Sequence, residues 1–584
     1  MKKVFLRITP SDKPNKDLKI LNLCYWPKNF RKDNYTLNYK NFFKTQNNKN
    51  RIKNLKLAHQ ISIKIIKFLY KQISKKSNFK FSKEEYELIF YQFIISFTYM
   101  IIDRKLMIDE FFLNKKIKKF IANKIYQNKD EFICNSTIEF LGLIQTDKFN
   151  NFLVLEILKE NEKFNIEIKK NKARKKIKKN VNINFFSHFK DLIQIYLSKF
   201  SYNFNKVVFE SIYYPRLKFI KDCLRFRIFP YKVTKLFFLN FNSELDVQRR
   251  NKLKNDLKLS KFSKLEKLVG NLLFDIIPKN YLENFDQIIN HLSCYSNKKK
   301  IITSISFFHN EIFRIFLVFA KRNQTKIIQC DHGGGLAFDN VPNPYIQKKF
   351  FDNFAVWGKH SHIKKVPDKK KIFINPTLPS LDINLNNESN KNYLSILFYE
   401  SRKFVIEYDG LQSFENQNKS LNNLIYISKK LPEHISKKIV FRSLRNYGLE
   451  SENRFYENVL NSKKNRKNFE ISKSFEKVLK HSKLIVCNFP STSFSEALSL
   501  NIPTLLFCNE REILLDKKSR NFLIKMKKNK MSFDDASKLK EHIKNIWANP
   551  NGWWEKKNIQ NLRTDYLRSY FNVVDHLPSS WIKD

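Results

Sequence analysis

The sequence predicts an α/β protein with two parallel sheets and an N-terminal region of long helices. Short apolar runs alternate with helical segments from about residue 300 onward, and a second series of the same kind follows Pro376 and Pro379. Such alternation is typical of parallel sheets that helices cover on both faces. Between Leu55 and Phe200, in contrast, apolar residues recur every three or four positions, which indicates amphipathic helices.

The first α/β series is predicted to contain a strand over 301–308 and a helix from Glu311 to Arg322. Strands over 326–330 and 354–357 follow. Because the carboxyl ends of parallel strands lie at one edge of a sheet, we expect a ligand cleft where the loops of the two sheets meet.

The second series is predicted to contain strands over 394–399, 439–441, 484–488 and 504–507. Far upstream, residues 20–23 form a short strand candidate. Residues 163–184 are predicted to be a basic connector of low complexity.

The composition is that of a folded and strongly basic protein. The chain has 584 residues, of which 42% are hydrophobic, and a formal net charge of +55. This charge would attract nucleic acid, anionic lipid or phosphorylated substrates. Lysines recur along almost the whole chain instead of forming one stripe with aromatic residues between them, which favours a solvated surface over a specific nucleic-acid site.

Signals for metal binding, disulfides and membrane insertion are weak. The seven cysteines are scattered without metal-ligand spacing, so we expect no zinc site and a reducing compartment. Charged residues soon interrupt the apolar start of the chain, and the apolar stretch 88–102 is shorter than the ~20 residues of a spanning helix. A cytoplasmic protein is expected, with peripheral contact to the inner membrane left open.

A histidine followed by glycines marks the first candidate site. His332 precedes Gly333, Gly334 and Gly335 at the end of the strand predicted over 326–330, and the whole chain contains only nine glycines. Glycines let a ligand approach the backbone closely, so the segment indicates a ligand cradle. An ordinary glycine turn is the alternative.

A hydroxyl-rich turn marks the second candidate site. Ser491, Thr492 and Ser493 follow an apolar strand and open a helix that carries Glu496 one turn later. Backbone N–H groups at a helix start favour phosphate, and a nearby carboxylate can accept hydrogen bonds from a ribose. The spacing of Ser493 and Glu496 equally fits a capping box that needs no ligand.

Two arginines are weaker candidates for the same site. Arg442 and Arg445 follow the strand predicted over 439–441, and their forked donors suit phosphate or carboxylate, although isolated arginines more often solvate a surface. No pair of carboxylates stands near a strand end with metal-binding spacing, so neither a metal nor another cofactor is predicted.

Taken together, these segments resemble a family of transferases encoded among bacterial surface-polysaccharide genes. More distant relatives are capsule-type sugar transferases and polyglycerol-phosphate transferases. The resemblance runs nearly end to end, and its motifs are Lys19 to Trp26, Tyr99 to Arg104, Thr146 to Asn150, Gln329 to Gly335, Asp352 to Gly358, Phe441 to Gly448, Ser491 to Ala497, and Trp553-Trp554.

The resemblance implies a GT-B-like pair of Rossmann-like domains that face a cleft. It also implies that His332 and its glycines line the cleft, and that the 491–493 turn and Glu496 hold a donor nucleotide. The sequence departs from the family pattern in three places: Cys330 and Asp331 separate Gln329 from His332, Leu336 replaces an aromatic residue, and Gln347 stands near the place of a carboxylate.

We therefore expect three regions: a mainly helical region over 1–200, a Rossmann-like domain over 201–380, and a donor-binding Rossmann-like domain with closing helices over 381–584. The predicted reaction moves a sugar from a nucleotide-sugar donor to a surface glycan or lipid-linked precursor. His332 either takes the proton of the acceptor hydroxyl, which is the favoured role, or contacts the donor phosphate. Two alternatives remain, a polyol-phosphate transferase and a basic nucleic-acid-binding protein.

Overall fold

The structure is a computed structural model. It describes residues 4–8, 19–22, 48–74, 79–113, 119–160, 165–170, 185–293 (except 213 and 215), 295, 298–331, 344–360, 371–373, 391–399, 414–443, 455, 458–459 and 475–572. Within these residues the strands form three sheets, and every strand pair in them is parallel.

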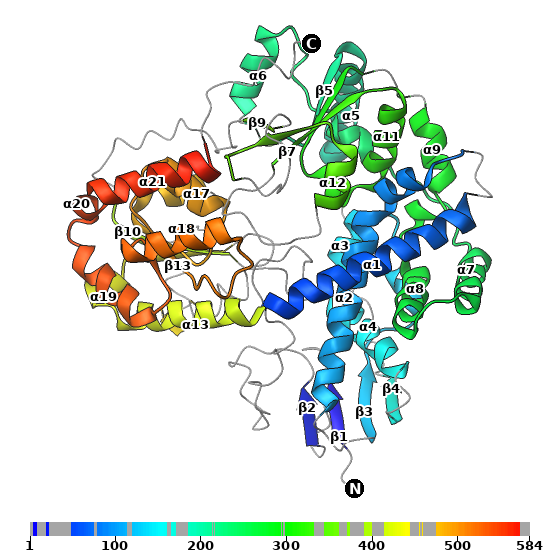
Figure 1. Cartoon of the computed structure of the whole chain (residues 1–584), viewed down its shortest axis with the longest axis horizontal. Coiled ribbons are helices and arrows are strands. Elements are labelled where there is room, and N and C mark those ends of the chain that lie inside the picture. Colours follow the sequence, from blue (N-terminus) through cyan, green and yellow to red (C-terminus); the bar gives the residue numbers. More distant parts are fainter. Residues whose placement is uncertain are drawn as a thin grey trace.

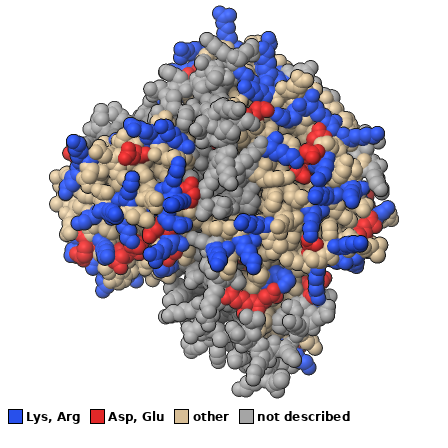
Figure 2. All heavy atoms as spheres, in the orientation of Figure 1, with Lys and Arg blue, Asp and Glu red and all other residues tan. Residues whose placement is uncertain are grey.

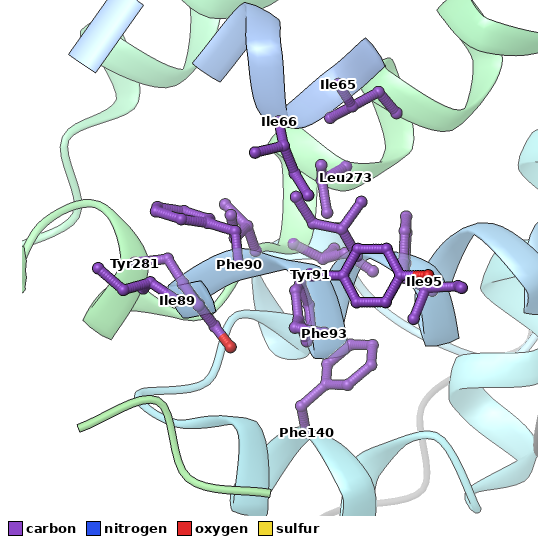
Figure 3. Close-up of a cluster of buried hydrophobic side chains, with 14 of the residues drawn as sticks. Ile65, Ile66, Ile89, Phe90, Tyr91, Phe93, Ile95, Phe140, Leu273 and Tyr281 are labelled. Atoms are coloured by element: carbon purple, nitrogen blue, oxygen red, sulfur yellow. The ribbon is translucent and has the colours of Figure 1, made fainter. Parts of the chain in front are cut away.

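The N-terminal region packs long helices around an aromatic core. Its helices are α1 (Asn48–Ile73), α2 (Lys83–Leu113), α3 (Thr137–Leu143) and α4 (Asp147–Lys159). Figure 3 shows Phe93 of α2 between Phe140 of α3 and Tyr281, and its ring centroid lies 5.1 Å from each of theirs. The stretch 88–102 lies in α2 and is almost wholly buried in this core, as expected.

No helix among the described residues is both long enough and apolar enough to cross a bilayer.

A small sheet in the same region corrects the sequence prediction. Its order is β2 (Lys19–Asn22), β1 (Val4–Arg7), β3 (Lys119–Lys124) and β4 (Asn165–Lys170), so strands interrupt the stretch expected to be helical throughout. The strand β4 also lies inside the predicted basic connector. Ile166 and Ile168 of this strand pack against the core and alternate with polar residues, which is the two-residue period of a β-strand. The strand was missed because lysines dominate the surrounding sequence.

The first large sheet has the order β5 (Val207–Glu210), β6 (Lys300–Thr303), β7 (Lys326–Cys330), β8 (Asn353–Val356) and β9 (Lys371–Phe373). The helices in this part of the chain are α5 (Phe185–Phe204), α6 (Arg216–Arg225), α7 (Val247–Leu259), α8 (Lys264–Ile276), α9 (Phe285–Ser293), α10 (Ser306–His309), α11 (Glu311–Arg322) and α12 (Pro344–Phe350). Of these, α7 packs on α8, and α8 packs beside α1 and α2 of the N-terminal region. The bounds predicted for β7 and α11 are confirmed.

The strand predicted over 301–308 is wrong beyond Thr303, because α10 begins at Ser306. Ser306 Oγ donates a hydrogen bond of 2.5 Å to the buried Glu210 carboxyl. If β6 continued straight to residue 308, Ser306 would lie beyond the end of β5 and could not reach Glu210. The chain turns after Thr303 instead, and Ser306 donates its hydrogen bond to the Glu210 carboxyl.

The second large sheet has the order β11 (Ile439–Ser443), β10 (Tyr393–Phe398), β12 (Ser482–Cys487), β13 (Thr504–Phe507) and β14 (Ser532–Phe533). Its helices are α13 (Phe414–Lys430), α14 (Glu433–Ser436), α16 (Phe475–His481), α17 (Thr492–Ser499), α18 (Lys517–Lys528), α19 (Ala536–Ile546), α20 (Pro550–Trp554) and α21 (Lys557–Tyr570). The four strands predicted for this series are confirmed.

The last described residues, at the end of α21 and directly after it, contact the first large sheet (Figure 1). After α21, Asn572 N donates to Trp357 O at 2.5 Å, and the ring of Phe571 meets the ring of Trp357 edge-on. His360 N likewise donates to Ser569 O at 2.8 Å. These contacts join the carboxyl end of β8 to the last helix. The predicted α/β class, with two parallel sheets and an N-terminal elaboration, is confirmed.

Candidate functional site

The strand order of the second large sheet locates the candidate site. The chain passes from β10 to β11 on one side and then crosses to β12 on the other side of β10. In a parallel sheet, the loops leave two such neighbouring strands in opposite directions, and ligands bind in the crevice between them. The carboxyl ends of β10 and β12 are therefore the place to look for a ligand.

Asn488 fixes the two loops at this place. The residue is fully buried, its Oδ1 accepts from Tyr399 N at 2.6 Å, and its Nδ2 donates to Tyr399 O at 3.0 Å. The ring of Phe489 stacks on the ring of Tyr399 with centroids 4.9 Å apart. The end of β12 is thus held rigidly against the end of β10, and the turn that follows has a defined position.

The hydroxyl-rich turn opens α17 without a side-chain cap. Ser491 is the N-cap residue in an extended conformation, and its side chain makes no capping hydrogen bond. The first hydrogen bond of the helix runs from Ser495 N to Ser491 O at 3.1 Å. The N–H groups of the first turn, from Thr492 to Phe494, therefore take no part in the i→i−4 hydrogen bonds of α17.

The capping-box alternative for Ser493 and Glu496 is wrong. A capping box requires Ser493 to be the N-cap residue, whereas Ser493 lies inside α17 and Glu496 lies one turn beyond the helix start. Ser491, Thr492 and Ser493 are partly exposed at the helix end. Glu496 consequently has no structural role in capping this helix.

Glu496 is a buried carboxyl group with an unusual pKa. Only 7% of the residue is exposed, and within the described part of the chain no donor forms a hydrogen bond with its carboxyl group. Burial raises the pKa of Glu496 to about 8, and the attraction of Arg442 opposes this rise. A mostly buried carboxyl group with a raised pKa and no hydrogen-bond donor among the described residues is a candidate for a functional site.

Arg442 lies on β11, on the other side of β10, and aligns with Leu397 of that strand. Its guanidinium group sits over the ring of Phe475 at 4.8 Å, which limits its rotation. The structure thus brings Arg442 and Glu496 into one electrostatic environment although they are far apart in the sequence. A cation, an open helix start and a buried carboxyl can together hold a phosphorylated ligand that carries hydroxyl groups.

Several predicted site residues lie outside the described residues. These are His332, Gly333, Gly334, Gly335 and Arg445. Their neighbours are described: Asp331 is buried at the end of β7 and accepts from Trp357 N at 3.0 Å, and Gln347 is buried in α12. Asp331, which interrupts the family motif, therefore fixes the end of β8.

The carboxyl edge of the first large sheet holds a second polar cluster, which sequence reasoning missed. Glu210 ends β5, is fully buried, and accepts from Ser211 Oγ, Thr303 Oγ1 and Ser306 Oγ at 2.7, 2.7 and 2.5 Å. Burial raises the pKa of Glu210, while the three hydroxyl donors and Lys232 oppose the rise. An acidic residue directly after the apolar run Val207 to Phe209 was the signal in the sequence.

Within the described residues, no group of three or more His, Cys, Asp or Glu side chains is placed to hold a metal ion.

Similarity to solved structures is loose. A spinosyn rhamnosyltransferase, SpnG, complexed with spinosyn aglycone is 9% identical, with a TM-score of 0.32 over 62% of this chain and 95% of that one. A UDP-GlcNAc 2-epimerase from Neisseria meningitidis bound to UDP-GlcNAc is 12% identical, with a TM-score of 0.32 over 62% of this chain and 97% of that one. Superpositions with such low scores support no conclusion about this chain.

No curated protein is similar enough to this chain to count as a match. A family model described as "LIC12162 family transferase", in contrast, matches residues 5–584. Because this match spans nearly the whole chain, the chain belongs to the LIC12162 family of transferases.

Proposed function

We propose that this transferase moves a sugar from a nucleotide-sugar donor to a surface glycan or to its lipid-linked precursor. The donor diphosphate binds at the start of α17, next to Ser491, Thr492 and Ser493, and the ribose hydroxyls donate to Glu496. Arg442 balances the negative charge that develops on the leaving diphosphate. No step of this scheme requires a metal ion.

The observation that carries the proposal is the state of Glu496. Its carboxyl lies at the switch point of a parallel sheet, is 7% exposed, and has no hydrogen-bond donor among the described residues. The hydroxyls of a bound ribose would donate hydrogen bonds to this carboxyl group. Such bonds stabilise the ionised carboxylate, which burial otherwise disfavours.

The acceptor end of the reaction rests on His332, which the family resemblance places in the cleft. His332, which follows β7 by two positions in the sequence, takes the proton from the acceptor hydroxyl, and the glycines after it let the substrate approach the backbone. Polyol-phosphate transfer would use the same donor site, and phosphorus would then appear in the product.

The test is release of nucleotide from UDP-, GDP-, CMP- and CDP-linked donors by wild type and two variants. Glu496→Gln should raise KM for the donor by roughly tenfold or more, because a hydrogen bond to a charged group is lost. His332→Ala should lower kcat by about 10²-fold or more with little change in KM.

Glu541→Gln is the matched control, because Glu541 is an exposed acid on α19 that pairs with Lys540 and Lys544 at the surface of the same domain. It should match wild type in both constants. Unchanged kinetics in Glu496→Gln would remove Glu496 from the donor site, and no release from any donor would overturn the proposed reaction.

A further inference from the structure

The helix α5 carries its apolar side chains on the outside of the molecule. Tyr196 is 70% exposed, Phe204 63% and Leu192 60%. The exposed apolar residues of this helix are Phe189, Leu192, Ile193, Tyr196, Phe200 and Phe204. Their spacings of three and four positions place them on one continuous face, which we call the α5 apolar face.

The opposite side of α5 faces the protein and combines polar residues with one core aromatic residue, Tyr202. Ser201 Oγ donates to Tyr231 O at 2.6 Å, and Asn205 Nδ2 donates to Phe229 O at 2.9 Å. Ser198 and Ser201 are fully buried. The helix therefore leaves most of its large apolar side chains outside the core, whereas a helix of a globular protein usually buries its apolar side. A continuous surface of large exposed apolar side chains indicates a site that binds another molecule or a membrane.

The charges beside the α5 apolar face are positive. Lys190 and Lys199 are exposed on the two edges of this face. Each residue advances an α-helix by about 100°, so Lys190 lies about 100° to one side of Phe189 and Lys199 about 80° to the other side. Asp191, the acidic residue of the described helix, is paired with Lys235 at 2.8 Å. An apolar face with lysines on both edges is the pattern of helices that lie in the interface of an anionic bilayer.

The neighbouring helix α6 also exposes apolar and basic side chains. The helix α6 exposes Leu217 and Leu224 together with Arg216, Lys221 and Arg225. Figure 1 shows α5 and α6 in the upper part of the view, beside β5 and at a distance from the domain that contains β10 to β14. The apolar face therefore lies away from the candidate donor site, which would stay accessible to nucleotide.

We propose that the α5 apolar face docks the enzyme on the surface of an anionic membrane. Phe189, Leu192, Tyr196 and Phe200 enter the headgroup region, and Lys190 and Lys199 contact anionic headgroups at its edge. A membrane is favoured over a protein partner because exposed lysines flank the apolar residues on both edges of one helix, which matches the charge of an anionic bilayer surface. Docking is independent of the donor site and needs no turnover.

The test is flotation of the full chain with vesicles of phosphatidylcholine alone and of phosphatidylcholine with an equal amount of phosphatidylglycerol. Wild type should float with the anionic vesicles. A triple variant with Leu192→Gln, Tyr196→Gln and Phe200→Gln should bind these vesicles at least about tenfold more weakly. A double variant with Lys190→Gln and Lys199→Gln should lose about fivefold per lysine, and only on anionic vesicles.

The control carries the same change at exposed apolar residues elsewhere: Leu259→Gln, Tyr426→Gln and Ile524→Gln. It should float as wild type does, and circular dichroism should show all variants folded. Equal flotation of wild type and the α5 triple variant would overturn the proposal. Binding to neither vesicle, combined with a wild-type dimer that the triple variant loses in sedimentation, would assign the face to a second copy of the chain.

Discussion

Glu496 shows how one buried side chain can connect ligand binding with pH. Burial raises the pKa of its carboxyl to about 8, so most of it is protonated in the free protein at neutral pH. Ribose hydroxyls prefer the ionised form as an acceptor, and bound nucleotide should therefore lower this pKa.

Nucleotide binding should consequently tighten as pH rises toward about 8 and level off above it. Below this value the affinity should change by at most about tenfold per pH unit, because one proton is released on binding. Titration calorimetry with the donor's nucleoside diphosphate measures the effect. Glu496→Gln should bind more weakly with a nearly flat pH profile, whereas a wild-type profile as flat as that of the variant would contradict the role of Glu496.

The same pKa affects stability without any ligand. The unfolded carboxyl ionises near the ordinary value of 4.5 and the folded one near 8, so the folded state binds the extra proton between these values. The free energy of unfolding of wild type should therefore fall relative to that of Glu496→Gln as pH rises through this window, by up to a few kcal/mol. Chemical denaturation of both proteins at matched pH values is the measurement.

At the scale of elements, the end of α21 is positioned by a glycine of the other domain. A Cβ atom added at Gly358 would lie 2.4 Å from Ser569 O and 2.6 Å from Tyr570 N, both of which are backbone atoms. Backbone cannot move aside as the tip of a flexible side chain can. Gly358 is therefore required for the close approach of β8 and α21.

Gly358→Ala should loosen this contact. Overpacking of this kind typically costs about 1–3 kcal/mol, and here the loss should appear as faster hydrogen exchange in residues 566–572. Gly142→Ala is the control, since nothing lies within 4 Å of the added Cβ and alanine favours the helix α3. Equal exchange in Gly358→Ala and wild type would show that the two elements do not dock in solution.

At the scale of the whole molecule, the charge of +55 is spread over the surface. Figure 2 shows Lys and Arg side chains over both lobes of one face, with Asp and Glu between them. Many described lysines are also paired, as Lys321 is with Asp352 at 2.9 Å. Such a distribution supports weak attraction to any polyanion better than recognition of one nucleic acid.

We expect the chain to bind duplex DNA of unrelated sequences with equal affinity at low salt. This affinity should fall by about 10³-fold or more between roughly 50 mM and 200 mM salt. The reason is that lysines and arginines bind DNA phosphates by releasing counterions, and added salt opposes that release. Fluorescence anisotropy with labelled duplexes tests this. Tight, sequence-dependent binding at roughly 150 mM salt would instead support the nucleic-acid-binding alternative.

Much of the fold could be predicted because it follows local patterns. The helix Glu311–Arg322 and the strand Lys326–Cys330 have the predicted bounds, since apolar periodicity and the change in composition mark both ends. The strands β3 and β4 were missed, because lysine and asparagine mask the short period of a strand. The end of β6 was misplaced, because Ser306 turns to satisfy Glu210, a residue 96 positions away.

The sequence by itself determined the α/β class and the helix start at Ser491 to Ser493 with Glu496 behind it, because strand and helix patterns and turn residues act over a few positions. Only the tertiary structure decided what those residues can do. It alone places Arg442 near Glu496, locks Asn488 onto Tyr399, leaves the Glu496 carboxyl buried without a donor among the described residues, and turns the apolar side of α5 outward. Burial and electrostatic environment depend on segments that are distant in the sequence, so no local pattern can encode them.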